Sequence, residues 1–123
     1  MRPSRAMVLI LMLVTVSACT TIPARFTQDP GISESGGYRI EEETSHGFTL
    51  EVFYKAYSFL PNPDPAIQEA RAYFSRIALE LAKRKGKTIR PFSTADLHAS
   101  ATRNIMDGHY AVYVTGKVLY AME

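Results

Sequence analysis

The sequence predicts an α+β fold, in which three or four mainly antiparallel strands form a sheet and one helix packs on one face, as a two-layer sandwich. Three observations lead to this prediction. Apolar and polar side chains alternate over residues 48–59 with the period of two that is typical of a strand. Apolar residues recur at spacings of three and four over residues 64–85, as in an amphipathic helix. Asp107-Gly108 stands between two further alternating segments, which indicates a hairpin.

Residues 1–18 have the organisation of an export signal peptide. Arg2 and Arg5 give it a positive start, residues 6–14 are apolar, and small residues lead to a cleavage point after residue 18. An uncleaved anchor is disfavoured because a hydrocarbon core of about 30 Å needs roughly 20 apolar helical residues. Cleavage of an ordinary secretory signal at the same point is a further alternative.

Cys19, the one cysteine of the chain, directly follows this cleavage point, and it has no partner for a disulfide. Val16-Ser17-Ala18-Cys19 resembles the lipobox of bacterial lipoproteins, in which the cysteine is lipidated and becomes the first residue of the mature protein. The resemblance implies a membrane anchor on Cys19. In such lipoproteins an aspartate after the cysteine commonly retains the protein at the inner membrane. Thr20 therefore implies the outer membrane, with the domain facing the periplasm.

The mature chain is balanced in charge. The full sequence has 14 Lys and Arg against 12 Asp and Glu, and removal of Arg2 and Arg5 makes the two totals equal. No strongly basic surface therefore favours a nucleic acid as partner. Residues 19–36 contain prolines, glycines and polar residues without a helical or strand period, and we expect a flexible tether with a reach of roughly 20–25 Å. Residues 37–123 form the expected periplasmic domain.

The domain is expected to start with an edge strand at Tyr38–Thr44, whose run of glutamates discourages association between sheets. The next strand, residues 48–59, places two sets of side chains on opposite faces. One face has Phe48, Leu50, Val52, Tyr54 and Ala56, and the other has Thr49, Glu51, Phe53, Lys55 and Tyr57. Prolines in residues 61–65 end this strand because proline donates no backbone hydrogen bond.

The helix is expected to have Asp64 as its N-cap and Pro65 as its first residue, to continue to about Lys85, and to end at Gly86. Its apolar stripe comprises Ile67, Ala70, Phe74, Ile77, Ala78 and Leu81. A connector follows, with a short strand expected around residues 88–92.

The remaining residues form the expected hairpin. A two-residue turn pairs Ile105 with Tyr110, Ala101 with Val114, Ala99 with Gly116, Leu97 with Val118 and Ala95 with Tyr120. One face is then apolar and the other polar, and the small residues of the apolar face leave room for Phe74 and Ile77 of the helix.

Two surfaces are candidate binding sites. Phe53, Tyr57 and Tyr113 are expected on the sheet face without a helix, where they would bind a partner or only stabilise the sheet through cross-strand pairs. Lys83, Arg84, Lys87 and Arg90 form the densest positive patch. This patch would bind an anion, or would only complement the negative end of the helix dipole.

No set of residues predicts catalysis, a metal site or a cofactor. The three histidines, His46, His98 and His109, do not converge as zinc ligands do. The chain has no Gly-x-Ser-x-Gly motif and no pair of carboxylates spaced for glycoside hydrolysis. We therefore expect a protein that is not an enzyme.

The helix segment Tyr73-Phe74-x-x-Ile77-Ala78-x-Glu80-Leu81-Ala82, the lipobox and the opening Gly37-Tyr38 together resemble the small proteobacterial lipoproteins of unknown function. This resemblance implies a fold and an envelope address but no chemistry. The sequence thus predicts a non-enzymatic, membrane-tethered interaction module whose partner is an envelope protein or peptidoglycan. The alternative is a binder of an anionic lipid, a lipopolysaccharide or another small ligand at the basic end of the helix.

Overall fold

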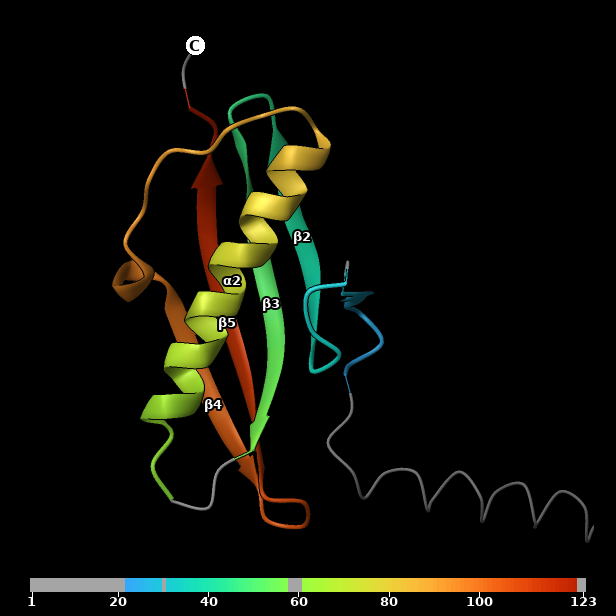
Figure 1. Cartoon of the computed structure of the whole chain (residues 1–123), viewed down its shortest axis with the longest axis vertical. Helices are drawn as coiled ribbons and strands as arrows, with labels where there is room; N and C mark the ends of the chain where they lie inside the picture. Colours follow the sequence, from blue (N-terminus) through green and yellow to red (C-terminus); the bar gives the residue numbers. More distant parts are fainter. Residues whose placement is uncertain (1–21, 30, 58–60, 122–123) are drawn as a thin grey trace, which may run out of the picture.

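A computed structural model describes residues 22–29, 31–57 and 61–121 of the chain. Its antiparallel sheet has the strand order β1-β2-β3-β5-β4, and the helix α2 lies across one face (Figure 1). The elements are β1 (Thr27–Gln28), β2 (Gly36–Thr44), β3 (Gly47–Tyr57), α2 (Asp64–Arg84), the 3-10 helix η2 (Thr94–Asp96), β4 (His98–Asn104) and β5 (His109–Leu119). The predicted α+β class is confirmed. The predicted signal peptide and Cys19 lie outside the described residues.

Strand β3 is central because it pairs along its length with β2 on one side and with β5 on the other. The two predicted faces of this strand are confirmed. Leu50 and Val52 are fully buried in the core between the sheet and α2, where the Tyr54 ring lies 4.9 Å from that of Tyr73. The alternate residues, such as Glu51, belong to the opposite side of the sheet, named the helix-free face below.

Helix α2 begins one position earlier than the predicted N-cap implies. Asp64 is its first residue, Pro63 is the N-cap, and no side chain caps the helix. The Asn62 side chain accepts a hydrogen bond from the Asp64 N–H instead (3.1 Å). At the other end Gly86 has a φ of +68°, as expected for a glycine that follows a helix. The buried face comprises Ala66, Ala70, Tyr73, Phe74, Ile77, Ala78, Leu81 and Ala82.

The hairpin of β4 and β5 has the predicted faces but another register. Asn104 pairs with His109, so that four residues, Ile105 to Gly108, form the turn in place of the predicted two. The Gly108 N–H donates to the Asn104 carbonyl (3.0 Å), and the Asn104 side chain accepts from the Met106 N–H (2.9 Å). These bonds stabilise the longer loop. A shift of two residues still leaves each side chain on its predicted face, because a strand has a period of two.

The start of the predicted hairpin strand is not a strand. Residues 94–96 form η2, and Leu97 is buried in the core. Gly116 does lie close under the helix as predicted, since a Cβ there would be 2.3 Å from Leu97 and 3.1 Å from Phe74. The short strand expected around residues 88–92 is reduced to a single bridge between Ile89 and Tyr120.

The predicted flexible tether is wrong over most of its length. Residues 22–29 and 31–35, named the strap below, pack on the domain, and β1 within the strap pairs with the start of β2. Phe26 is only 7% exposed. The strap crosses the helix-free face and reaches α2, where the Tyr73 hydroxyl donates a hydrogen bond to the Asp29 carboxylate. The domain therefore begins no later than Ile22, mainly because the buried Phe26 side chain holds the strap on the sheet.

Candidate functional site

The predicted aromatic surface is covered by the strap. Phe53 is 1% exposed, and the Phe26 ring lies 6.0 Å from both the Phe53 and the Tyr113 rings. Arg25 adds a cation–π contact, with its guanidinium 5.4 Å from the centre of the half-buried Tyr113 ring. Phe53 is thus a core residue beneath the strap, and the expectation that it binds a partner directly is wrong, whereas Tyr113 is only partly covered.

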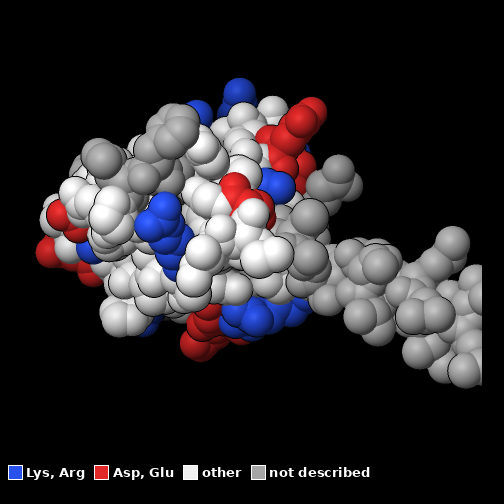
Figure 2. Space-filling model, turned by 90° about the horizontal axis from the view of Figure 1, so that it is seen from below, with Lys and Arg blue, Asp and Glu red and all other residues white. Residues whose placement is uncertain are grey.

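Tyr57, the third residue predicted there, is exposed at the far end of β3. It packs edge-on against His109 (5.5 Å) and over the β4–β5 turn, where Ile105 and Met106 are the most exposed large apolar side chains among the described residues. Figure 2, the view from this end, shows a mostly uncharged surface that is interrupted by a few basic and acidic side chains. Tyr57 therefore belongs to a separate apolar end and not to a cluster with Phe53.

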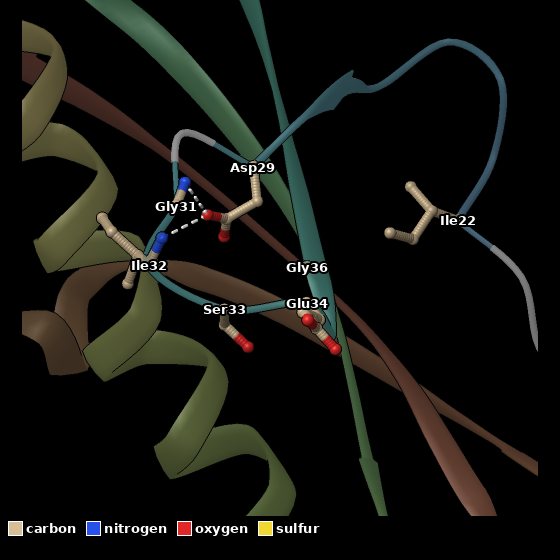
Figure 3. A pocket seen from close by; sticks show the side chains of 7 residues that line it. All are labelled: Ile22, Asp29, Gly31, Ile32, Ser33, Glu34 and Gly36. Atoms are coloured by element: carbon tan, nitrogen blue, oxygen red, sulfur yellow. Dashed lines mark hydrogen bonds between the residues drawn. The ribbon is translucent and has the colours of Figure 1, made fainter.

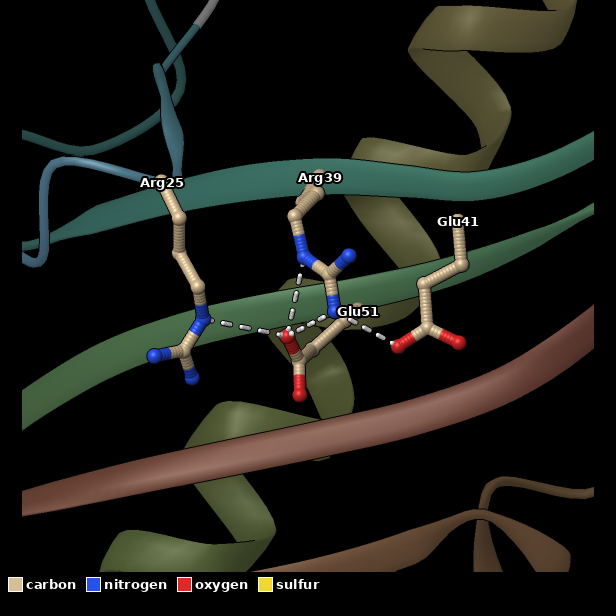
Figure 4. Close-up of polar contacts among 4 residues, drawn as sticks. All are labelled: Arg25, Arg39, Glu41 and Glu51. Carbon is tan, nitrogen blue, oxygen red and sulfur yellow. Dashed lines mark hydrogen bonds and ion pairs between the residues drawn. The ribbon is translucent and has the colours of Figure 1, made fainter.

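Charged side chains fasten the strap to the helix-free face (Figure 4). One oxygen of Glu51 accepts hydrogen bonds from Arg39 (3.0 and 3.3 Å) and lies 3.7 Å from the Arg25 guanidinium. Arg39 also binds Glu41 (2.9 Å). Because each group has a partner of opposite charge, this cluster accounts for how the strap is held and offers no free charge for a ligand.

Asp29 turns the strap toward the helix (Figure 3). One of its carboxylate oxygens accepts from the N–H of Gly31 (2.7 Å) and from that of Ile32, while the other accepts the Tyr73 hydroxyl. Burial first, and then this hydrogen bond, raise the pKa of Tyr73 far above its ordinary value. A hollow of about 490 Å³ lies beside this turn, but Asp29 is already occupied by three donors.

A second region, at the C-terminal end of α2, combines free positive charge with apolar surface. Two adjoining hollows of about 450 and 300 Å³ share Leu79 and Ile89. We name them together the basic groove. Its apolar wall is formed by Leu79, Ile89 and Phe92, and its cations are Lys83, Lys87 and Arg90.

The sequence builds this groove from two segments. Leu79 lies off the buried stripe of α2 and is 57% exposed, so that its side chain can form one wall of the groove. The connector after Gly86 returns along the helix and is fixed to β5 by hydrogen bonds between Arg90 N and the Leu119 carbonyl (2.8 Å) and between Ala121 N and the Thr88 carbonyl (2.8 Å). Phe92 is held edge-on against the core ring of Phe74 (5.9 Å).

The four predicted anion-binding residues divide into two groups. Lys83, Lys87 and Arg90 line the basic groove, whereas Arg84 lies outside it and forms an ion pair with Glu80 (3.6 Å). The neighbouring Lys85 pairs with Glu43. Among the described residues no carboxylate lies in an ion pair with the three groove cations, and none lines the groove.

A third hollow of about 370 Å³ lies on the other side of the connector. It is lined by Ser45, His46, Lys87, Thr88, Arg90, Leu119, Tyr120 and Ala121, again without a carboxylate among the described residues. The Lys87 ammonium lies 5.9 Å from the centre of the Tyr120 ring. Lys87 and Arg90 therefore border space on both sides of the connector.

The cations are not needed to satisfy the helix end. The Ala82 carbonyl accepts N–H bonds from Lys85 (3.0 Å) and Lys87 (2.9 Å), and the Lys83 carbonyl accepts one from Gly86 (3.0 Å). The positive side chains still complement the helix dipole, each by about 0.3–1 kcal/mol. Their ammonium and guanidinium donors remain available to an anion.

Sequence reasoning found the cations of the groove but missed its apolar wall. The position of Leu79 outside the apolar stripe of α2 could have indicated an exposed apolar residue, whereas nothing in the spacing of Ile89 and Phe92 indicated that the connector would fold back beside it.

Comparison with models of protein families, with curated proteins and with solved structures found no match. Within residues 22–29, 31–57 and 61–121, no helix is long and apolar enough to cross a membrane. The same residues hold no group of three or more His, Cys, Asp and Glu side chains arranged for a metal ion.

Proposed function

We propose that this protein is a non-enzymatic lipoprotein of the outer membrane, anchored through Cys19, whose periplasmic domain binds an anionic amphiphile in the basic groove. The lipobox supports the anchor. The groove supports the ligand class, because it places three cations without carboxylate partners among the described residues beside an apolar wall.

The combination of charge and apolar surface is the observation that carries the proposal. A small inorganic anion would use the cations and leave Leu79 and Phe92 in water. An uncharged lipid would cover the apolar wall and leave the cations without a partner. A molecule with an acyl or similar apolar part and a phosphate or carboxylate group satisfies both, with the charged contacts worth roughly 1.5–3 kcal/mol each.

The test uses the mature chain with Cys19→Ser, which removes the attached lipid, and a short-chain phosphatidic acid below its micelle concentration. We expect binding to be visible in amide NMR shifts of residues 79–92 and to weaken as salt is raised. The double variant Lys87→Glu with Arg90→Glu should weaken binding about tenfold or more, since 1.4 kcal/mol corresponds to a factor of ten.

Two controls make the experiment specific. The double variant Arg84→Glu with Lys85→Glu removes two cations that have carboxylate partners outside the groove, changes the net charge by the same amount, and should bind nearly as tightly as the parent protein. A short-chain phosphatidylcholine has the same acyl chains with a headgroup of no net charge, and should bind at least several-fold more weakly. Equal affinity of the double variant and the parent for phosphatidic acid would show that the groove is not the binding site.

The exposed apolar end favours a second candidate function, which is binding of an envelope protein. Tyr57, Ile105 and Met106 together expose apolar side chains at one end of the sheet. A photocrosslinking residue at position 106 in the lipidated protein should then give one defined crosslinked species in intact cells, which Ile105→Asp should abolish. Unchanged crosslinking in that variant would exclude this surface.

A further inference from the structure

The strap brings the folded domain close to the proposed anchor. Ile22 is the first described residue, and it follows Cys19 by three residues. Consecutive Cα atoms are 3.8 Å apart, so the Cα atoms of Cys19 and Ile22 are separated by no more than about 11 Å in any conformation. A tether of this length leaves no room for the domain to stand away from the membrane.

Ile22 also has a defined side of the sheet. A Cβ on Gly37 would lie 3.1 Å from an Ile22 methyl group and 3.3 Å from the Phe26 Cβ. Gly37 pairs with Phe53 across the β2–β3 ladder, and paired residues point to the same face. Ile22 is therefore on the helix-free face, while α2 forms the other layer (Figure 1) and supplies Leu79 and Lys83 of the basic groove.

Two lysines of the helix-free face are available to lipid phosphates. Lys55 and Lys117 lie on it through their registers with Ala111 and Thr49, and neither is in an ion pair with a described carboxylate. Cations next to an anionic lipid surface contribute about 1 kcal/mol each.

We infer that the helix-free face lies against the phospholipid surface that holds the anchor, and that the basic groove opens away from it toward the aqueous side. This inference rests on the proposed anchor at Cys19. It gives the groove a direction: its ligand arrives from the periplasm and not from the membrane in which the protein is anchored.

The experiment uses the lipidated protein, purified from membranes and reconstituted in vesicles that contain an anionic phospholipid and a lipid with a nitroxide headgroup. A thioether on Cys19 leaves an introduced cysteine as the only free thiol. Ala24→Cys and Ala72→Cys are a matched pair, because both replace an exposed alanine, one on the strap and one on α2. A fluorophore on residue 24 should be quenched at least about three times as strongly as one on residue 72, since the two layers separate them by roughly 20 Å.

The strap itself is tested by lengthening the connection. Sixteen Gly and Ser residues inserted after Thr21 add a reach of roughly 20–24 Å without changing any described contact. Quenching at residue 24 should then fall to the level at residue 72. Equal quenching at the two positions before the insertion, or stronger quenching at residue 72, overturns the orientation. If the protein carries no added lipid mass and does not float with the vesicles, both the anchor and the orientation are wrong. If it is lipidated and floats but its quenching is as just described, only the orientation is wrong.

Discussion

Replacing Phe26 by alanine tests whether the strap is part of the cooperative fold. The Phe26 side chain is 7% exposed and meets two aromatic rings at 6.0 Å. Truncation of a buried phenylalanine typically costs 3–5 kcal/mol. We place Phe26→Ala at about 3 kcal/mol, the low end of that range, because the strap lies at the surface and can partly close the space left behind.

The loss is measured by guanidinium-induced unfolding followed by circular dichroism and by the fluorescence of the tyrosines. For a domain of this size, about 3 kcal/mol corresponds to a fall in melting temperature of roughly 12–24 °C. Ile105→Ala is the matched control, since its side chain is 90% exposed and its removal should change the stability by no more than about 0.5 kcal/mol.

A change below about 1 kcal/mol for Phe26→Ala would refute the reasoning, because no well-packed aromatic residue is removed so cheaply. Amide exchange adds an independent result. If the strap docks as described, the variant should lose protection at Thr27 and Tyr38, which pair in the β1–β2 ladder, before any loss at the centre of β3.

Three further predictions concern single positions. Because the pKa of Tyr73 is raised in the folded protein above its unfolded value near 10, its contribution to stability is complete below that pH and is lost as pH rises above it, so Tyr73→Phe should flatten the fall in melting temperature between pH 9 and 11. Gly116→Ala should destabilise the domain by about 1–3 kcal/mol in urea unfolding, because its Cβ meets Leu97 at 2.3 Å, and a change near zero would contradict this close approach. Gly86→Ala, where a Cβ meets no atom within 4 Å but φ is +68°, should cost only about 1 kcal/mol by the same measurement, and a larger loss would mean that more than backbone conformation is involved.

The parts of the fold that follow from a repeating pattern were predicted from the sequence. The period of two in β3 fixes which side chains meet the helix, and this holds even for β4 and β5, where the predicted register was wrong by two residues. The turn itself was mispredicted because Asp107-Gly108 suggested a two-residue loop, while the Asn104 side chain and carbonyl favour a wider one.

The strap could not be predicted in the same way. Phe26 is one aromatic residue in a polar, proline-containing segment, and a single residue has no period that would indicate what it packs against. Its position depends on a tertiary contact with Phe53, which the sequence pattern placed on a solvated face. The same error produced both incorrect expectations, the free tether and the exposed aromatic surface. The cations of the basic groove were predicted because charge density is local in sequence, whereas the groove needs the connector to return beside Leu79.

The last strand along the chain, β5, joins both halves of the sheet. It lies between β3 and β4 and pairs with all eleven residues of β3. Residues up to the end of α2 can therefore form β2, β3 and the helix, but the core between them stays open on one side until residues 109–119 are in place. Residues 109–119 must therefore have left a ribosome or a membrane pore before the sheet can fold cooperatively. Such a strand order delays closure of the core until β5 has emerged.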